Sequence, residues 1–381
     1  MTRSSILFLS HEFPPLGGGA GLNGFNLCEE LVKRGWAVHV VTQRPPRSST
    51  RLFAFPITYI PSFRKRQLQT SFSSMLFFIA GALFCMLRQN RRFDIIFSNM
   101  AIPAGIAGAI ISFVAKTPHI IWHHGGDVHG GKISGARVMQ RFLLHAVWKG
   151  ATANCFVSNS LRTLAQSYGN LHNDFIIPVA PLMSNSLALP TIHKPEYFLF
   201  LGRLEKVKNP LVLIRAIETL KKSGLVLPHF KIIGDGILFD AIQSALGAAK
   251  LENAVTLEKN IPHDQVHLAL QSAYALICSS VIEGLNTTIL EAGLFGVPAI
   301  GSNVPEINAL IQHRKNGLLF ESNNAAELAS CIKELYENAS LRDILGKNAV
   351  QTASAFSVDR SADAFENLCA QGLNAGSRKP R

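Results

Sequence analysis

Residues 275–301 read ALICSSVIEGLNTTILEAGLFGVPAIG. The apolar run at 275–279 predicts a buried strand, and the loop after it leads into an amphipathic helix over 288–295. A second short apolar run, 299–301, predicts the next strand. This order of strand, helix and strand is typical of a crossover unit with parallel strands, so the stretch predicts an α/β fold.

The same alternation extends over the rest of the chain. The expected strands are 6–10, 38–42, 95–98, 120–124, 154–158, 175–178, 197–201, 230–234, 255–257, 275–279 and 299–301, and the expected helices are 24–34, 73–87, 104–115, 136–148, 161–168, 210–222, 237–249, 264–271, 288–295 and 324–338. A polar, proline-containing stretch over 181–195 predicts a linker. We therefore expect two doubly wound domains, residues 1–185 and residues 190–359, with a cleft between them where the carboxyl ends of the strands meet a ligand.

Composition and charge narrow the class of protein. With 48% hydrophobic and 16% charged residues over 381 positions, the chain is neither disordered nor a disulfide scaffold. Its six cysteines form no Cys-x-x-Cys, which favours buried, reduced thiols in a cytoplasmic protein. Residues 1–190 hold 18 Lys and Arg against 6 Asp and Glu, whereas residues 191–381 balance 19 against 19, so the whole excess of +12 lies in the first half. This asymmetry predicts an anionic partner for the N-terminal domain, with ordinary solubility charge as the alternative.

One apolar segment raises the question of a membrane. Residues 75–87 are apolar but too short for a span, which needs about 20 residues, so they predict a core or interfacial helix. Basic residues flank the segment on both sides: Arg64, Lys65 and Arg66 before it, and Arg88, Arg91 and Arg92 after it. Residues 95–115 carry no charge, but polar residues and a proline interrupt them, and they predict strand, turn and helix. We expect the basic cluster to hold the protein on an anionic membrane surface.

Two motifs of the first half follow predicted strands. The glycine turn Gly17–Gly19 stands between a strand and a helix, where backbone N–H groups can approach an anion. A purely structural turn would also use glycines. The second motif, His123-His124-Gly125-Gly126-Asp127, ends another strand. There a histidine can bond a ligand hydroxyl while Asp127 orients it, unless the histidine is a core residue.

Two motifs of the second half place charges at strand ends. Arg203 and Lys208 lie in one loop, at a spacing that can wrap a pyrophosphate. Glu283 lies in the loop after residues 275–279, and Glu291 follows inside the next helix. The start of that helix favours phosphate, and the two carboxylates could accept hydroxyls of a ribose and a sugar. The alternatives are a turn residue for Glu283 and a capping acid for Glu291.

Together the motifs resemble those of the family 4 glycosyltransferases, over most of the chain. The matching blocks are the E-x7-E signature EGLNTTILEAGLFGVP at Glu283 to Pro298, Asn303 to Ile307, Asn316 to Leu319, Gly202-Arg203 with Lys208-Asn209, Gly17 to Gly19, and His124 to Asp127. After Glu283-Gly284 this chain has Leu285-Asn286, where the family often has an aromatic residue and glycine, and this difference could alter which donor sugar fits.

The resemblance implies the GT-B fold of two facing Rossmann-like domains. The first domain would bind the acceptor, the second would bind the nucleotide sugar, and a C-terminal helix over about 360–381 would return to the first domain. The implied reaction moves a sugar from a nucleotide sugar, most often UDP-linked, with retention of configuration and without a metal or another cofactor.

The resemblance also implies the roles of individual residues. The implied catalytic residues are His124, Asp127, Arg203, Lys208 and Glu283. The implied nucleotide-sugar-binding residues are Gly17, Gly18, Gly19, Arg203, Lys208, Glu283, Gly284, Leu285, Asn286, Thr287 and Glu291. Arg203 and Lys208 would hold the departing diphosphate and Glu291 the ribose. Glu283 and His124 would contact the donor sugar.

We expect a hexosyl- or N-acetylhexosaminyltransferase that builds a bacterial surface glycan such as lipopolysaccharide. It would work in the cytoplasm, peripherally on the inner face of the plasma membrane, on an anionic glycolipid or oligosaccharide acceptor. The alternatives are a transferase that makes a soluble glycoside, a nucleotide-sugar epimerase of the same fold, and a non-enzymatic binding protein. Nucleic acid is not an expected partner, because no basic helix carries interleaved aromatic residues.

Overall fold

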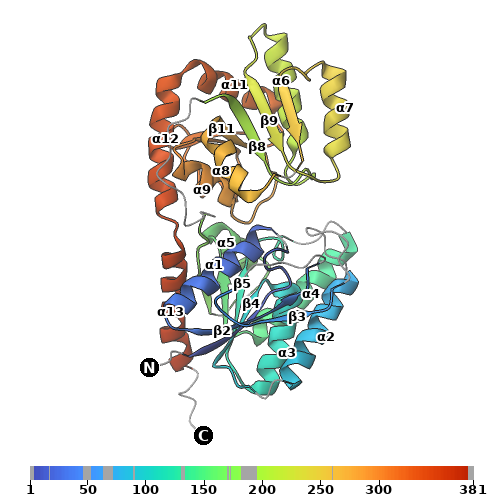
Figure 1. Ribbon diagram of the computed structural model, residues 1–381, viewed down its shortest axis with the longest axis vertical. Helices are drawn as coiled ribbons and strands as arrows, with labels where there is room; N and C mark the ends of the chain where they lie inside the picture. The colour runs from blue at the N-terminus through green and yellow to red at the C-terminus, as the bar shows by residue number, and fades with distance from the viewer. Residues whose placement is uncertain are drawn as a thin grey trace. The chain divides into compact units, whose positions relative to one another are not determined.

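The computed structural model describes residues 4–16, 18–45, 53–62, 72–88, 91–129, 134–169, 171, 173–181, 195–259 and 261–375. It divides into two compact α/β units, an N-terminal domain of Met1–Ala180 with Ser357–Arg381, and a C-terminal domain of Pro181–Phe356 (Figure 1). The predicted α/β class is therefore correct.

The N-terminal domain is built on a parallel sheet of seven strands in the order β3-β2-β1-β4-β5-β6-β7. The strands are β1 (Ser5–Leu9), β2 (Ala37–Gln43), β3 (Ile57–Ile60), β4 (Ile95–Asn99), β5 (His119–His123), β6 (Ala153–Phe156) and β7 (Asp174–Ile176). The central strands are buried on both faces, as their unbroken runs of Ile, Leu, Phe and Val predict.

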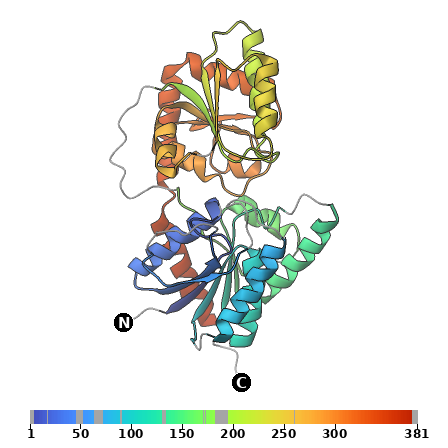
Figure 2. The same cartoon turned by 45° about the vertical axis from the view of Figure 1, so that its right-hand side comes forward.

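Helices cover both faces of this sheet. They are α1 (Gly19–Lys33), α2 (Phe72–Arg88), the turn η1 (Ala101–Gly105), α3 (Ile106–Ala115), α4 (Ser134–Gly150), α5 (Asn159–Gln166) and α13 (Val358–Ala375). Helices α1 and α13 contact each other on one face, whereas α2, α3 and α4 lie on the other (Figures 1 and 2). The right-handed crossover explains why α1 lies opposite α2, α3 and α4, because the step from β1 to β2 runs along the sheet opposite to the steps from β3 to β6. Helix α13, which links no two strands of this sheet, joins α1 by direct contact.

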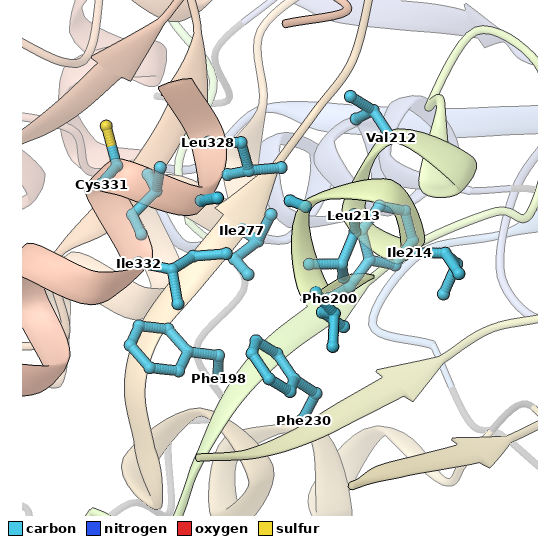
Figure 3. Packing of buried hydrophobic residues seen from close by; sticks show 14 of the residues in the cluster. Phe198, Phe200, Val212, Leu213, Ile214, Phe230, Ile277, Leu328, Cys331 and Ile332 are labelled. Carbon is cyan, nitrogen blue, oxygen red and sulfur yellow. The ribbon is translucent and has the colours of Figure 1, made fainter. Parts of the chain in front are cut away.

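The C-terminal domain has a six-stranded parallel sheet in the order β10-β9-β8-β11-β12-β13. The strands are β8 (Tyr197–Leu201), β9 (His229–Ile233), β10 (Val255–Glu258), β11 (Ala273–Cys278), β12 (Ala299–Ser302) and β13 (Gly317–Phe320). The helices are α6 (Pro210–Lys222), α7 (Phe239–Ala249), α8 (His263–Gln271), α9 (Thr287–Leu294), α10 (Pro305–Asn308), α11 (Ala325–Glu337) and α12 (Ala339–Ser354). Phe198, Phe230 and Ile277 on the sheet pack with Leu213 of α6 and Ile332 of α11 in its largest core cluster (Figure 3).

Each expected strand and helix forms, with ends shifted by a few residues. The sequence analysis missed β3, β13, α10 and α12. Helix α12 shows little hydrophobic periodicity because it meets α9 through small residues. A Cβ on Gly293 would lie 2.9 Å from the Ala349 carbonyl oxygen and 3.0 Å from the Ala353 Cβ.

Candidate functional site

In the C-terminal domain, two loops meet beyond the neighbouring strands β8 and β11. The backbone N–H of Val281 donates to the carbonyl of Val207 at 2.9 Å. The Ser279 hydroxyl donates to the carbonyls of Lys208, at 2.9 Å, and Asn209, at 3.0 Å. The loop that carries Lys208 is thus fastened to the loop that carries the first predicted carboxylate.

Lys208 and Glu283 form an ion pair where these loops meet. The Lys208 Nζ donates to Oε1 of Glu283. The same oxygen accepts hydrogen bonds from Ser280 Oγ at 2.7 Å and Asn286 Nδ2 at 3.0 Å. The Glu283 side chain is 9% exposed and that of Lys208 is 21% exposed. Three donors therefore fix the Glu283 carboxylate. The carboxylate in turn positions the Lys208 ammonium group where the two loops meet.

Helix α9 starts beside this ion pair. Its cap is Asn286, whose Oδ1 accepts from the Thr288 N–H at 3.2 Å while its Nδ2 holds Glu283. The helix start and the carboxylate are therefore linked by one side chain. The partial positive charge at a helix start favours an anion in front of it. Gly284, Leu285 and Thr287 are partly exposed around this start.

Glu291 lies inside α9 and is buried, with 3% of its surface exposed. The first turn of α9 contains no acidic residue. Glu291 is the fifth residue of α9 and so lies beyond the first turn. Its neighbours Ile289, Leu290 and Ala292 belong to a core cluster, so packing fixes the segment that carries the carboxylate.

Arg203, the second predicted cation, is more exposed. Among the described residues it pairs with Glu205 of its own loop, at 3.1 Å, and 49% of its side chain is exposed. The structure thus brings Lys208 to Glu283 and leaves Arg203 beside Glu205. The long, exposed side chain of Arg203 can carry its guanidinium group to a ligand.

The sequence analysis missed two glycines at the end of β9. Gly234 and Gly236 both adopt a positive φ of 159°. A Cβ on Gly234 would lie 1.9 Å from the carbonyl oxygen of Gly202, so only glycine allows these loops to approach. The signal was present as Gly-Asp-Gly directly after an apolar strand.

In the N-terminal domain, Asn99 holds His124. The Asn99 Nδ2 donates to Ser10 Oγ and to the carbonyl of Ala20, both at 3.0 Å, which turns Oδ1 toward the imidazole. The Nε2 of His124 lies 2.7 Å from that oxygen and must carry the proton. Burial lowers the pKa of His124 to about 4, against the opposing effect of Asp127. His124 is therefore a neutral imidazole with its Nδ1 as an acceptor.

Asp127 orients the other histidine of the motif. Its Oδ2 lies 2.8 Å from Nδ1 of His123 and accepts the Ala101 N–H at 2.9 Å. Burial would raise the pKa of Asp127, but His123 and the Ala101 N–H outweigh it and lower the pKa to about 2. His123 and Asp127 are both buried, so His123 is the core histidine of the pair. The expectation that Asp127 orients a ligand-facing histidine is corrected: it holds His123 and, through it, the loop.

The glycine turn precedes α1. Gly17 lies outside the described residues. Gly18 and Gly19 are exposed, and Gly18 as the N-cap has no side chain to cap α1, so among the described residues an anion could approach the first N–H groups of the helix. A Cβ on Gly18 would meet nothing within 4 Å, whereas a Cβ on Gly21 would lie 2.8 Å from the carbonyl oxygen of Glu12. Crowding inside the domain thus explains why residue 21 is glycine, but it does not explain the glycine at residue 18.

Two family models match the chain. Residues 17–177 match Glycosyltransferase Family 4, and residues 187–352 match Glycosyl transferases group 1. Among curated relatives, an uncharacterized glycosyltransferase of Methanocaldococcus jannaschii is 26% identical over 71% of this chain and 74% of its own length. TuaC of Bacillus subtilis, a candidate teichuronic acid biosynthesis glycosyltransferase, is 24% identical over 90% of this chain and 96% of its own length.

Solved structures share the fold. Sucrose-phosphate synthase from Thermosynechococcus elongatus superposes with a TM-score of 0.84 at 18% identity, covering 98% of this chain and 100% of that one. Anabaena HepE in complex with UDP-glucose gives 0.73 at 18% identity, covering 97% and 100%. The lipopolysaccharide outer core galactosyltransferase WaaB gives 0.67 at 16% identity, covering 98% and 99%. The fold of this chain is therefore GT-B, and the chain is a glycosyltransferase that joins a Family 4 domain to a group 1 domain.

Proposed function

We propose that this enzyme moves a hexosyl or N-acetylhexosaminyl group, with retention of configuration, from a UDP-sugar to an anionic glycolipid or oligosaccharide of the bacterial cell surface. The observation that carries the proposal is the Lys208–Glu283 ion pair beside the start of α9. Similar proteins support the donor and the pathway, since HepE was solved with UDP-glucose, WaaB is a lipopolysaccharide outer core galactosyltransferase and TuaC is a candidate for teichuronic acid synthesis.

The reaction breaks the bond between the anomeric carbon and the diphosphate oxygen, so negative charge grows on the diphosphate. Lys208 and the partial positive charge at the α9 start are in place to stabilise that charge, and Arg203 is long enough to join them. Donors fixed before the reaction need no reorganisation as the charge develops. Residues of the protein thus stabilise the charge of the leaving diphosphate, and we propose that the reaction proceeds without a metal.

Other residues bind the donor. Glu291 accepts the ribose hydroxyls, the partly exposed segment Gly284–Thr287 lies along the nucleotide sugar, and Glu283 positions the donor sugar. His124 offers the neutral Nδ1 as an acceptor for a sugar hydroxyl. Gly18 and Gly19, with Gly17 of the same motif in the sequence, bind phosphate through backbone N–H groups. Asp127 acts as a positioning residue through His123.

The test is binding followed by transfer. Thermal shifts with UDP, GDP and ADP should single out UDP, and ligand at ~100 times its Kd stabilises the protein by about 2.7 kcal/mol. Transfer from UDP-sugars to lipid-linked and soluble acceptors is then followed, with the anomeric configuration of the product read by NMR. Stabilisation by none of the three nucleotides would overturn the proposal. Release of UDP with an altered sugar and no acceptor would show an epimerase, and transfer to soluble acceptors alone would show a soluble-glycoside synthase.

A further inference from the structure

Exposed apolar side chains gather on one part of the molecule. Among the described residues, fifteen large hydrophobic side chains are exposed, and ten of them lie on helices α2, α3 and α4 of the N-terminal domain. The ten residues are Phe72, Leu76, Phe77, Phe84, Leu87, Ile110, Phe113, Val114, Phe142 and Leu143. We call this set the α2–α4 apolar face. The other five are scattered over the C-terminal domain.

Helix α2 supplies half of the face. Phe72, Leu76, Phe84 and Leu87 are spaced by about one, two and one helical turns, and they are 76%, 51%, 57% and 82% exposed. The opposite side of the helix, with Phe78 among its residues, is buried against the sheet. A surface helix of a water-soluble domain normally turns a polar side outward, so the outward side of α2 is unusual.

Helices α3 and α4 extend the face. Phe113 and Val114 near the end of α3 are 87% and 70% exposed, and Phe142 of α4 is 70% exposed. Helix α3 contacts both α2 and α4, and the three helices share the sheet face opposite α1 and α13 (Figures 1 and 2). Large contiguous apolar patches on a soluble domain mark sites of interaction with a partner or a membrane.

The charges on these helices indicate what kind of partner binds the α2–α4 apolar face. The sequences of α2, α3 and α4 contain no Asp or Glu, whereas α1 and α13 on the opposite face carry Glu29, Glu30, Asp359, Asp363 and Glu366. The same helices and the residues that follow them carry exposed cations: Arg88 at the end of α2, Arg91 and Arg92 shortly after it, Lys116 at the end of α3, and Arg141 and Lys149 on α4. Long cationic side chains can reach lipid phosphates while apolar neighbours enter the acyl region.

We propose that the α2–α4 apolar face docks on a lipid bilayer that contains anionic phospholipid. No helix within the described ranges is long and apolar enough to cross a bilayer. The proposed contact is therefore one with the bilayer surface, into which the apolar side chains would insert. Arg64, Lys65 and Arg66, which the sequence analysis assigned to the same role, lie outside the described residues. The proposal stands apart from the sugar-transfer site, because none of the ten residues belongs to it.

Flotation with vesicles tests the proposal. The full chain is mixed with vesicles of equal parts phosphatidylglycerol and phosphatidylcholine, or of phosphatidylcholine alone. We expect binding to the anionic vesicles. The variant Phe84→Ser/Leu87→Ser/Phe113→Ser should lower the partition coefficient at least about a hundredfold. The matched control Val226→Ser/Ile344→Ser removes exposed apolar residues from the other domain and should bind like the wild type.

A second variant tests the charge. Arg88→Gln/Arg91→Gln/Arg92→Gln should lower binding to anionic vesicles by about a hundredfold, since each cation near such a surface contributes about 1 kcal/mol. Circular dichroism checks that each variant is folded, and this variant leaves the apolar residues in place should the serine variant fail to fold.

Three results would overturn the proposal. They are no binding of the wild type to anionic vesicles, binding by both variants that equals that of the wild type, and a concentration-dependent dimer that the serine variant abolishes in the absence of vesicle binding. Sugar transfer to a soluble acceptor separates this inference from the proposed function. A protein that transfers sugar but does not bind vesicles contradicts only the docking face, and a protein that binds vesicles but transfers nothing contradicts only the proposed reaction.

Discussion

Lys208 and Glu283 stand 75 residues apart in the chain, and in the folded C-terminal domain the ammonium group of the first donates to the carboxylate of the second. Because Ser280 and Asn286 hold the same carboxylate oxygen, the cation is positioned before any ligand arrives. A diphosphate that binds here, as we propose, must share Lys208 with Glu283. We therefore expect the two residues to affect nucleotide binding in opposite directions, and each can be tested separately.

Replacing Lys208 with alanine should lower kcat/KM for the nucleotide sugar by about a hundredfold, because a fixed charge-assisted donor to the leaving group is lost. The domain should stay folded, since Lys208 lies on a partly exposed loop. The matched control is Lys206→Ala, which removes an exposed lysine of the same loop and should keep near-normal turnover. Steady-state kinetics of both variants test whether Lys208 stabilises the leaving diphosphate, and equal activities of the two variants would contradict this role.

Replacing Glu283 with glutamine should separate binding from turnover. The loss of one negative charge near the diphosphate leaves Lys208 more available, so UDP affinity should rise by about twofold to fivefold. Sugar transfer should fall, because the substitution removes the carboxylate to which we assign the positioning of the donor sugar. Calorimetry with UDP and a transfer assay give the two readings. Unchanged values in both would show that Glu283 is only a turn residue.

Replacing Glu291 with glutamine keeps the size of a buried side chain and removes its charge. If the carboxylate accepts the ribose hydroxyls, UDP affinity should fall by about tenfold or more. The affinity for 2′,3′-dideoxyuridine diphosphate, which lacks both hydroxyls, should change by less than about twofold under the same substitution. An equal loss for both nucleotides would point to a disturbed helix and would contradict the ribose contact.

The sequence predicts most of the fold because the central strands are unbroken apolar runs, which need no tertiary information to recognise. Strand β13 (Gly317–Phe320) is short, and α12 packs through alanine and glycine, so neither leaves a periodic signal. These elements form because β12 and α9 provide surfaces for them.

The residues of the candidate site were also predictable only in part from the sequence. The sequence analysis assigned Lys208 and Glu283 to two loops at strand ends, but it did not predict the ion pair that joins them in the structure. Which histidine Asp127 would hold was not predictable, since adjacent strand residues point to opposite faces and side-chain contacts decide the partner. Asn99, which holds His124 from 25 positions earlier, left only the weak signal of a polar residue that ends an apolar strand.

The stability of the N-terminal domain should fall as the pH drops below about 6.5. Burial lowers the pKa of His119 to about 3, and burial lowers that of His124 to about 4. The unfolded chain therefore binds more protons than the folded one between these values and 6.5, and each histidine removes up to about 1.4 kcal/mol per pH unit. Asp127 acts only at lower pH, because its pKa of about 2 lies below its ordinary value of 3.8.

Tryptophan fluorescence can follow this loss, since all three tryptophans of the chain lie in the N-terminal domain. The variant His119→Gln cannot take up the proton, so urea unfolding between pH 7.5 and 5 should show a slope smaller by up to about 1.4 kcal/mol per pH unit below 6.5. The comparison uses slopes, so a lower overall stability of the variant does not affect it. An identical slope in both proteins would mean that His119 keeps an ordinary pKa.

Replacing Asn99 with aspartate should make sugar transfer depend on pH. The new carboxylate would stand against Nε2 of His124 and raise its pKa from about 4, because a nearby negative charge favours the imidazolium. Below the new pKa, Nδ1 carries a proton and can no longer accept a hydroxyl, so kcat/KM should fall on the acid side of a profile from pH 5 to 8. The same substitution in a His124→Gln background lacks the titrating ring and should show no such fall. Profiles of one shape for wild type and Asn99→Asp would mean that the protonation of His124 has no part in catalysis.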